Sequence, residues 1–574
     1  MRRYCAAFAS PLLNRPALPR LQAPTEATEI RSQRSMMRNP ANHWRKGSTL
    51  TNQEAKGLGT ITGGSFRRSV RGALGGTVAL TIAAALLSWA TIWGRRVQKN
   101  PDVKLGAAPL VGQWKFRPSI GYLMPIGLAL LVIVAVPRLF VRLQTRWVVL
   151  SSVGLSAAFT AALAGTDGRV AMLAPVVHPT EYWYWLDKFP PVRQMLAVYD
   201  EYDFILNFST HIKGHPPGYA LLLKGLAALG LAKPWIVASL SYVSAGLVAG
   251  SVLVVARRLG SAKFTHKAAP FLILAPYTVW MGTSADAVFS ALVAMGAAGI
   301  ALAATSQRRN RKIAFAFIAG LLLGASFYSS WGTVTCGPII IAALWCGSTW
   351  PTSTWSTSTG SESTGCSSLS LPTHKANDPN LLSQRKQTSK VTIHQRVVNI
   401  APVTLAAVGG IGVVAAGMTA LGYNWFAGIG LTRRLYWKGT AQFRPWRYFL
   451  VGNLGAVLIA LGGVAIVGMG TLGFGRIRNR SSANSHNATR NQLSEDTSNG
   501  GTSFRWLRVF VLAGLICVLA ADFSQYSKGE VERIWLPFMP WLTLPAAILA
   551  RHRFWLVLQA TTAIGIQVML ISKW

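Results

Sequence analysis

The residues best suited to chemistry gather in one stretch of the chain, residues 166–217. This stretch contains six of the eighteen acidic residues and three of the nine histidines. Carboxylates and imidazoles are the side chains that most often move protons in catalysis. A long loop is typically functional or disordered, and the many aromatic residues here favour an ordered, functional loop. The six acidic residues are Asp167, Glu181, Asp187, Asp200, Glu201 and Asp203.

Two aspartates stand at the ends of apolar runs. Asp167 follows the run 147–165 by two residues, and Asp286 precedes the run that begins at Val288. Each has a plain structural interpretation, because Asp is common in turns and as a helix N-cap. A carboxylate beside an acceptor hydroxyl can instead act as a general base. Taken singly, these positions leave both interpretations open.

The segment GHPPG at residues 214–218 has a more specific geometry. Proline keeps the residue before it in extended backbone and is favoured at the start of a helix. We therefore expect an extended His215, followed by a helix over 218–231 that lies on the membrane surface. His211 and His215 have the spacing of two metal ligands on a helix, but the flanking glycine and proline disfavour one. No HExxH pattern is present, so no metal or other cofactor is expected.

The composition predicts an all-α polytopic membrane protein. Of the 574 residues, 51% are hydrophobic and 13% are charged, whereas soluble domains carry roughly 25% charged residues. Apolar runs recur along the chain, most of them near the ~20 residues that a helix needs to cross a bilayer. They predict about 13 transmembrane helices: 73–93, 120–136, 147–165, 235–256, 268–281, 288–304, 313–328, 334–346, 400–421, 449–472, 507–521, 534–549 and 554–571.

The net charge of +39 could indicate a nucleic-acid partner or the Lys and Arg excess of cytoplasmic loops. The cations cluster between the apolar runs, which favours the second interpretation and predicts no nucleic acid. The clusters are 138–146, 257–267, 308–312, 375–396, 476–508 and 551–553. Placing them inside predicts a multi-pass protein of the plasma membrane with a cytoplasmic N-terminus. Ten of the eighteen acids then face outward, together with one basic segment, 95–117.

Low-complexity segments predict the domain organisation. The five cysteines are scattered and have no metal-site spacing, so neither a disulfide framework nor a structural zinc site is expected. We expect a disordered basic cytoplasmic tail over 1–72, a transmembrane region over 73–346 with its outer loop at 166–217, a cytoplasmic loop over 347–399, a transmembrane region over 400–474, a second cytoplasmic loop over 475–506 and a C-terminal transmembrane region over 507–574.

The order of these motifs resembles that of the GT-C glycosyltransferases, in particular protein O-mannosyltransferases and lipid A aminoarabinose transferases. The similarity covers roughly residues 147–345: an outer Asp167 after an early helix, a long loop, HPPG, a span ending in ARRLG, and SADAVF around Asp286. Actinobacterial membrane proteins of unassigned role carry a similar GHPPG segment and a similar KGEVERIWLP segment, and resemble the chain more closely. The chain departs from the enzymes at Gly168, where they usually have Glu, and in HPPG, where they have HPPL or KPPL.

The resemblance implies a GT-C-like bundle with a long outer first catalytic loop and juxtamembrane helices. It implies transfer of a sugar from a polyprenyl-phosphate carrier in the membrane lipid to an unidentified acceptor on the outer face. Asp167 matches the family's general base, and Asp286 matches its second acid. The departing phosphate needs cationic or hydrogen-bonding partners. Candidates are His215, Lys528 and Arg533, with Arg433 and Arg434 as alternatives.

Two other functions stay open. One is a transporter or flippase for a lipid-linked or small polar substrate, and the other is a non-catalytic membrane protein with a GT-C-like fold. A transporter concentrates ionisable residues near mid-membrane in broken helices, whereas those of this chain stand at the ends of apolar runs. The aromatic residues 182–185 could stack on a sugar or form an interfacial belt.

Overall fold

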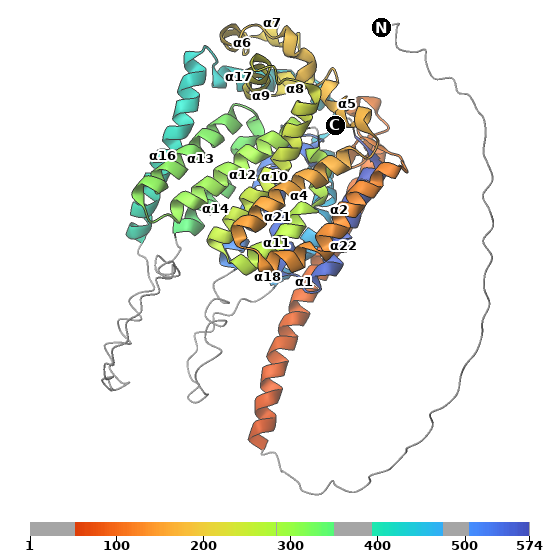
Figure 1. Cartoon of the computed structure of the whole chain (residues 1–574). Helices are drawn as coiled ribbons and strands as arrows, with labels where there is room; N and C mark the ends of the chain where they lie inside the picture. The colour runs from red at the N-terminus through yellow and green to blue at the C-terminus, as the bar shows by residue number, and fades with distance from the viewer. Residues whose placement is uncertain (1–51, 283, 349–392, 475–503, 573–574) are drawn as a thin grey trace, which may run out of the picture. The chain divides into compact units, whose positions relative to one another are not determined.

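The computed structural model describes residues 52–282, 284–348, 393–474 and 504–572 (Figure 1). The chain divides into a unit of residues 1–61 and a unit of residues 62–574. Helix α1 (Asn52–Val97) begins within the predicted tail, and its apolar part that could cross a membrane begins at Gly72, close to the predicted boundary. The rest of that tail and most of the loops predicted over 347–399 and 475–506 lie outside the described residues.

Nine helices of the described residues are long and apolar enough to cross a membrane, or ten if the bent pair α2–α3 counts as one span. A helix satisfies its backbone hydrogen bonds internally, which hydrocarbon requires. The chain is thus an all-α multi-pass membrane protein. The helices are α1, α4 (Thr145–Ala164), α10 (Pro234–Leu259), α12 (Ala285–Ala304), α13 (Arg309–Phe327), η5–α14 (Trp331–Ser348), α16 (Ile393–Ala420), α18 (Trp446–Phe474) and α19 (Arg505–Phe523), with α2 (Leu123–Val134) and α3 (Val136–Arg142) as the bent pair.

Continuous helices of the described residues do not reach the predicted count of about 13. The run 268–281 forms α11 (Ala262–Ile273) and the 3₁₀ helix η4 (Pro276–Met281), and the run 534–549 contains α21 (Met539–Thr543) and η7 (Leu544–Ile548). Prolines cause both breaks, because proline lacks the N–H that continues a helix. The run 554–571 forms α22 (His552–Met569), whose polar residues lower its hydropathy.

Side-chain contacts identify which segments share an end of the helical unit. Ser241, near the start of α10, donates a hydrogen bond to the carbonyl of Ser284 before α12 (2.9 Å). A Cβ on Gly282 would lie 3.1 Å from the Cβ of Ala164, the last residue of α4. At the other end, Oγ1 of Thr145 in α4 lies 3.2 Å from Nε2 of His266 in α11. The chain therefore reverses direction between α4, α10 and α12.

Charges are segregated between these two ends. Acidic side chains gather at the end formed by Ala164, Ser241 and Ser284, which we call the acidic end. Asp167, Glu181, Asp286, Asp522 and Glu530 lie there in contact with Arg117, His211, Arg533 and Asn453. The clusters 138–146, 257–267, 308–312 and 551–553 lie at the opposite, basic end, where His552 hydrogen-bonds to the carbonyl of Lys267 (3.0 Å). This matches the predicted separation. That the basic end faces the cytoplasm stays a prediction.

The predicted outer loop is an ordered layer of short helices over the acidic end, together with α17 (Figure 1). One of them, α9, has 11 residues and is too short to cross a bilayer, as predicted for 218–231. The basic segment 95–117 also lies here; β1 and β2 pair as a short antiparallel hairpin, and β3 pairs antiparallel with β4 near the end of the chain. The elements are α5 (Arg169–Val177), η3 (Trp183–Lys188), α6 (Val192–Val198), α7 (Tyr202–Ile205), α8 (Thr210–Gly214), α9 (Gly218–Ala228), α17 (Trp425–Lys438), β1 (Gly106–Ala107), β2 (Leu110–Val111), β3 (Gln113–Trp114) and β4 (Leu570–Ile571).

Candidate functional site

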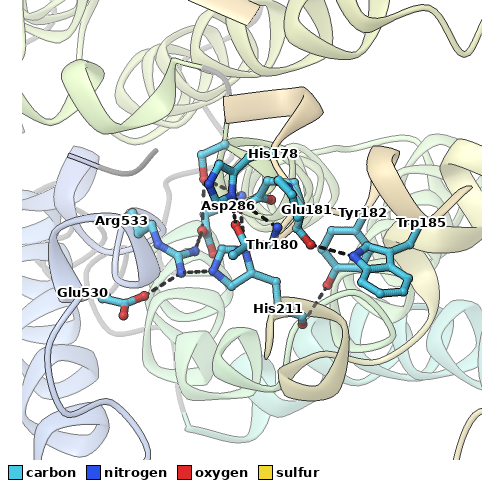
Figure 2. Close-up of polar contacts among 11 residues, drawn as sticks. His178, Thr180, Glu181, Tyr182, Trp185, His211, Asp286, Glu530 and Arg533 are labelled. Carbon is cyan, nitrogen blue, oxygen red and sulfur yellow. Dashed lines mark hydrogen bonds and ion pairs between the residues drawn. The ribbon is translucent and has the colours of Figure 1, made fainter. Parts of the chain in front are cut away.

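Arg533 lies at the centre of a buried charged network at the acidic end (Figure 2). Its Nη1 donates to Asp286 Oδ2 at 2.5 Å, and its Nη2 donates to Glu530 Oε2 at 2.8 Å. Burial lowers the pKa of Arg533, but the carboxylates of Asp286 and Glu530 outweigh it and raise this pKa above its ordinary value. Arg533 and Asp286 are only 5% and 3% exposed, so water screens their ion pair little.

His211 extends this network to Glu181. Its Nε2 lies 3.0 Å from Nη2 of Arg533, and its Nδ1 lies 2.5 Å from Glu181 Oε1. Because a guanidinium only donates hydrogen bonds, Nε2 of His211 accepts, and Nδ1 carries the proton donated to Glu181. Glu181, His211, Arg533 and Asp286 thus form one continuous hydrogen-bonded chain from the layer of short helices to α12, a candidate membrane span.

The network lines a small pocket that also contains His215. The imidazole of His215 lies beside the ring of Phe289, with 5.5 Å between ring centroids, and no described atom hydrogen-bonds to its Nδ1. Burial lowers the pKa of His215 to about 4, although Asp286 opposes this shift. His215 is therefore neutral at pH 7 and offers hydrogen bonds without positive charge. The pocket is lined by Glu181, Tyr182, His211, His215, Ser284, Ala285, Asp286, Phe289 and Arg533.

The GHPPG segment positions His215 as the sequence predicts. His215 is extended (φ −134°, ψ 154°), and α9 begins at Gly218. The Gly218 N–H donates to the carbonyl of Tyr328 at 2.6 Å, which ties the segment to the end of α13. A Cβ on Gly218 would collide with that carbonyl. Glycine is required here for close approach of two backbones.

Asp286 is held in place by Ser284, the N-cap of α12. The Ser284 Oγ accepts from the Asp286 N–H (3.1 Å) and donates to Asp286 Oδ2 (3.0 Å). The interpretation of Asp286 as the N-cap is therefore wrong. Its carboxylate occupies the first turn, where the helix dipole favours negative charge, and it faces Arg533.

An unusual backbone conformation positions Arg533. Gly529 and Glu530 both have positive φ, 85° and 64°, directly before the short helix α20 (Val531–Ile534). The left-handed conformation costs a non-glycine residue roughly 1–2 kcal/mol. Burial raises the pKa of Glu530, but Arg533 and Arg444 outweigh it and lower this pKa. Both arginines form ion pairs with Glu530.

Three of the five residues predicted for the site lie together. Asp286, His215 and Arg533 line the same pocket. Asp167 lies at the same end but is not among the lining residues, because its carboxylate is ion-paired with Arg117. The role of Asp167 as the general base implied by the resemblance stays a prediction.

Lys528 also lies outside the pocket lining. Its Nζ donates to the carbonyl of Ala441 (3.3 Å) and lies 4.4 Å from the ring centroid of Trp437. Burial and the neighbouring Arg444 lower the pKa of Lys528. The ammonium group is thus engaged with α17 and its flank rather than with Asp286.

Sequence reasoning missed the pairing of Glu181 with His211. In the sequence, nothing distinguishes Glu181 from the other five acids of residues 166–217, and the spacing of His211 from His215 raises only the question of metal binding. Thirty residues separate them, and no spacing rule links such positions. Among the described side chains, no group of three or more His, Cys, Asp and Glu is placed to hold a metal ion.

The aromatic residues 182–185 mainly hold the layer together. Tyr182 is buried, and its hydroxyl donates to the carbonyl of His211 (3.3 Å). The indole N–H of Trp183 donates to Ala232, and that of Trp185 to Pro179, each at 2.7 Å. These bonds fix the loop that presents Glu181 to the pocket.

A scan against protein-family models, a search of curated proteins and a search of solved structures each find no match to this chain.

Proposed function

We propose that this protein is a membrane glycosyltransferase that moves a sugar from a polyprenyl-phosphate carrier to an acceptor hydroxyl at the membrane surface. The observation that carries the proposal is the pocket of Asp286, Glu181, His211, His215 and Arg533. It combines proton acceptors with a guanidinium at the ends of the apolar helices. The resemblance of residues 147–345 to GT-C enzymes supports the same class of reaction.

The proposed reaction needs a base and a phosphate ligand. The acceptor oxygen bonds to the anomeric carbon, the bond from that carbon to the carrier phosphate oxygen breaks, and the phosphate leaves with the electron pair. The acceptor hydroxyl loses its proton to the base. Arg533 is proposed as the phosphate ligand, because a guanidinium matches phosphate oxygens in a bidentate contact.

Binding of phosphate by Arg533 would also activate the base. N–H groups turned toward phosphate would no longer be donated to Asp286 Oδ2 and His211 Nε2. Both atoms would then be able to accept the acceptor's proton. Glu181 would stabilise a protonated His211 through Nδ1. Asp167, the base implied by the resemblance, is the competing candidate.

The distribution of ionisable groups favours transfer over transport. The broken segments 268–281 and 534–549 contain no Asp, Glu, Lys, Arg or His. A transporter is expected to bind its substrate or coupling ion at such breaks. The acids described here instead gather at one end of the helices.

The test is sugar transfer by the purified full-length protein from labelled polyprenyl-phosphate sugars. We expect Asp286→Asn and Glu181→Gln each to lower the rate by about 10²–10⁴-fold, the usual effect of losing acid–base catalysis. Asp167→Asn should retain activity within about tenfold. Asp187→Asn, an exposed acid of the same layer, is the matched control and should transfer at the wild-type rate.

Two outcomes would contradict the proposal. One is an unchanged rate in both Asp286→Asn and Glu181→Gln. The other is wild-type protein that moves an intact lipid-linked sugar between leaflets and releases no free carrier, which would favour the flippase.

A further inference from the structure

Helix α17 presents a basic face that the proposed transfer does not use. Its exposed residues recur every three or four positions and so form one stripe along the helix. Leu431 and Leu435, on the opposite face, pack against the aromatic core of the outer layer. The exposed stripe consists of Phe426, Ile429, Gly430, Arg433, Arg434, Trp437 and Lys438.

Contacts place α17 beside the pocket. Thr432 Oγ1 donates to the carbonyl of Lys213 (3.3 Å) in α8, the helix that carries His211. The hydroxyl of Tyr436 donates to the carbonyl of Gln525 (3.0 Å) and accepts from the N–H of Lys528 (3.1 Å). The helix thus lies between α8 and the segment that leads to Arg533, and Figure 1 shows it next to α8 and α9.

The charges on this face are not compensated. Residues 425–447 contain five Lys and Arg and no Asp or Glu. Within the part of the chain that the structure describes, Arg433 and Arg434 form no ion pair. Three arginines of the acidic end do form ion pairs: Arg117 with Asp167, Arg444 with Glu530, and Arg533 with Asp286 and Glu530. Two adjacent exposed guanidinium groups without a carboxylate partner are suited to binding an anion from outside the chain.

The apolar residues of the stripe indicate where that partner lies. Phe426 is 78% exposed, and Ile429 and Trp437 are each 38% exposed. Exposed aromatic and aliphatic residues next to Lys and Arg are typical of a helix that lies in the membrane interface. There, apolar side chains enter the acyl boundary while long cationic side chains reach the head groups.

We infer that the exposed face of α17 binds the phosphate head groups of anionic membrane lipids. Arg433 and Arg434 supply positive charge to the phosphate oxygens, and Lys438 lies one turn beyond Arg434. Phe426, Ile429 and Trp437 hold the helix at the depth where those phosphates lie. Lipid binding here requires no sugar and no turnover, so it does not rest on the proposed transfer.

The experiment measures lipid retention by the purified full-length protein. Nanodiscs of phosphatidylcholine with dioleoylphosphatidylglycerol as the anionic probe are prepared, and the bound phosphatidylglycerol is counted by native mass spectrometry. Arg433→Gln/Arg434→Gln should weaken its apparent affinity by about tenfold or more, since each interfacial cation contributes about a factor of five. Arg433→Lys/Arg434→Lys should restore most of the binding.

The matched control is Arg95→Gln/Arg96→Gln, an exposed arginine pair at the acidic end, on α1. This double variant removes two positive charges from the acidic end, as the α17 variant does, and should retain wild-type affinity for phosphatidylglycerol. Equal loss in both double variants would overturn the inference in favour of a diffuse charge effect, and no loss in the α17 variant would overturn it outright. Displacement of the lipid by millimolar inorganic phosphate would also overturn it, because the site would then bind the free anion.

Discussion

Arg533 is shared by two carboxylates and an imidazole, and this arrangement links stability to chemistry at a single residue. Within a buried site, each partner compensates charge that water no longer solvates. The same guanidinium is the group proposed to receive the carrier phosphate. Its neighbour Glu532, in the same short helix α20, is fully buried.

Removal of the central cation should cost more stability than removal of a peripheral acid. Arg533→Gln leaves Asp286 buried without its ion pair, at a cost of about 3–5 kcal/mol. Glu530→Gln should cost less, because the Glu530 side chain is 23% exposed. The Tm of both variants, measured by thermal unfolding in the same detergent, checks this order. A larger fall in Tm for Glu530→Gln than for Arg533→Gln would contradict the prediction.

Glu532 should make stability depend on pH. Burial raises the pKa of Glu532 from 4.5 to about 7. Its contribution is therefore complete below about pH 4.5 and is lost as the pH rises through about 7, because the unfolded state ionises first. Glu532→Gln should flatten the fall in Tm between pH 5 and pH 8. Asp187→Asn serves as the exposed control and should keep the wild-type slope; an unchanged slope in Glu532→Gln would refute the assignment.

At the scale of elements, the HPPG turn connects the layer of short helices over the acidic end to the long apolar helices. The prolines set the backbone of His215, and Gly218 brings the turn against the last residues of α13. The contact joins two segments more than 100 residues apart. The position of His215 therefore depends on a backbone approach that a single methyl group would block.

Gly218→Ala should destabilise the protein and disturb the pocket. The new Cβ would meet the carbonyl of Tyr328, and overpacking of this kind costs about 1–3 kcal/mol. Gly214→Ala is the matched control, because nothing lies within 4 Å of a Cβ there. We expect a lower Tm for Gly218→Ala and an unchanged Tm for Gly214→Ala. Equal Tm values for the two variants would contradict the prediction, because the turn would then accommodate the Cβ without loss of stability.

At the scale of the whole molecule, three segments that are not among the long apolar helices still connect the two ends. Segment 534–549 leads from Arg533 at the acidic end to His552 at the basic end. Segment 262–281 leads from Thr145 at the basic end to Ala164 at the acidic end. Helix α22 leads from Lys267 at the basic end to Gln567, whose carbonyl binds Arg117 (2.9 Å) at the acidic end. Counting the bent pair α2–α3 and these three segments as one crossing each, together with the nine long apolar helices, we propose thirteen membrane crossings.

An odd number of crossings predicts that the two termini lie on opposite sides of the membrane. In a cysteine-free background, Asp187→Cys and a cysteine added after Trp574 should react with an impermeant maleimide from one side. Arg309→Cys should react from the other side. Labelling of the C-terminal cysteine from the same side as Arg309→Cys would favour ten crossings over thirteen.

The grouping of Asp286, His215 and Arg533 was implied by the resemblance to GT-C enzymes, and their shared pocket emerged only from the structure. Local chemistry in the sequence was enough to predict the membrane class, the segregation of acids from basic clusters and the short helix after GHPPG. These follow from apolar run length, proline geometry and charge placement, which are properties of neighbouring residues. The tertiary structure alone decided that Asp167 pairs with Arg117, that Lys528 faces α17, and that Glu181 and His211 complete the pocket. Those pairings depend on which distant segments meet when the helices pack, and spacing along the chain does not encode them.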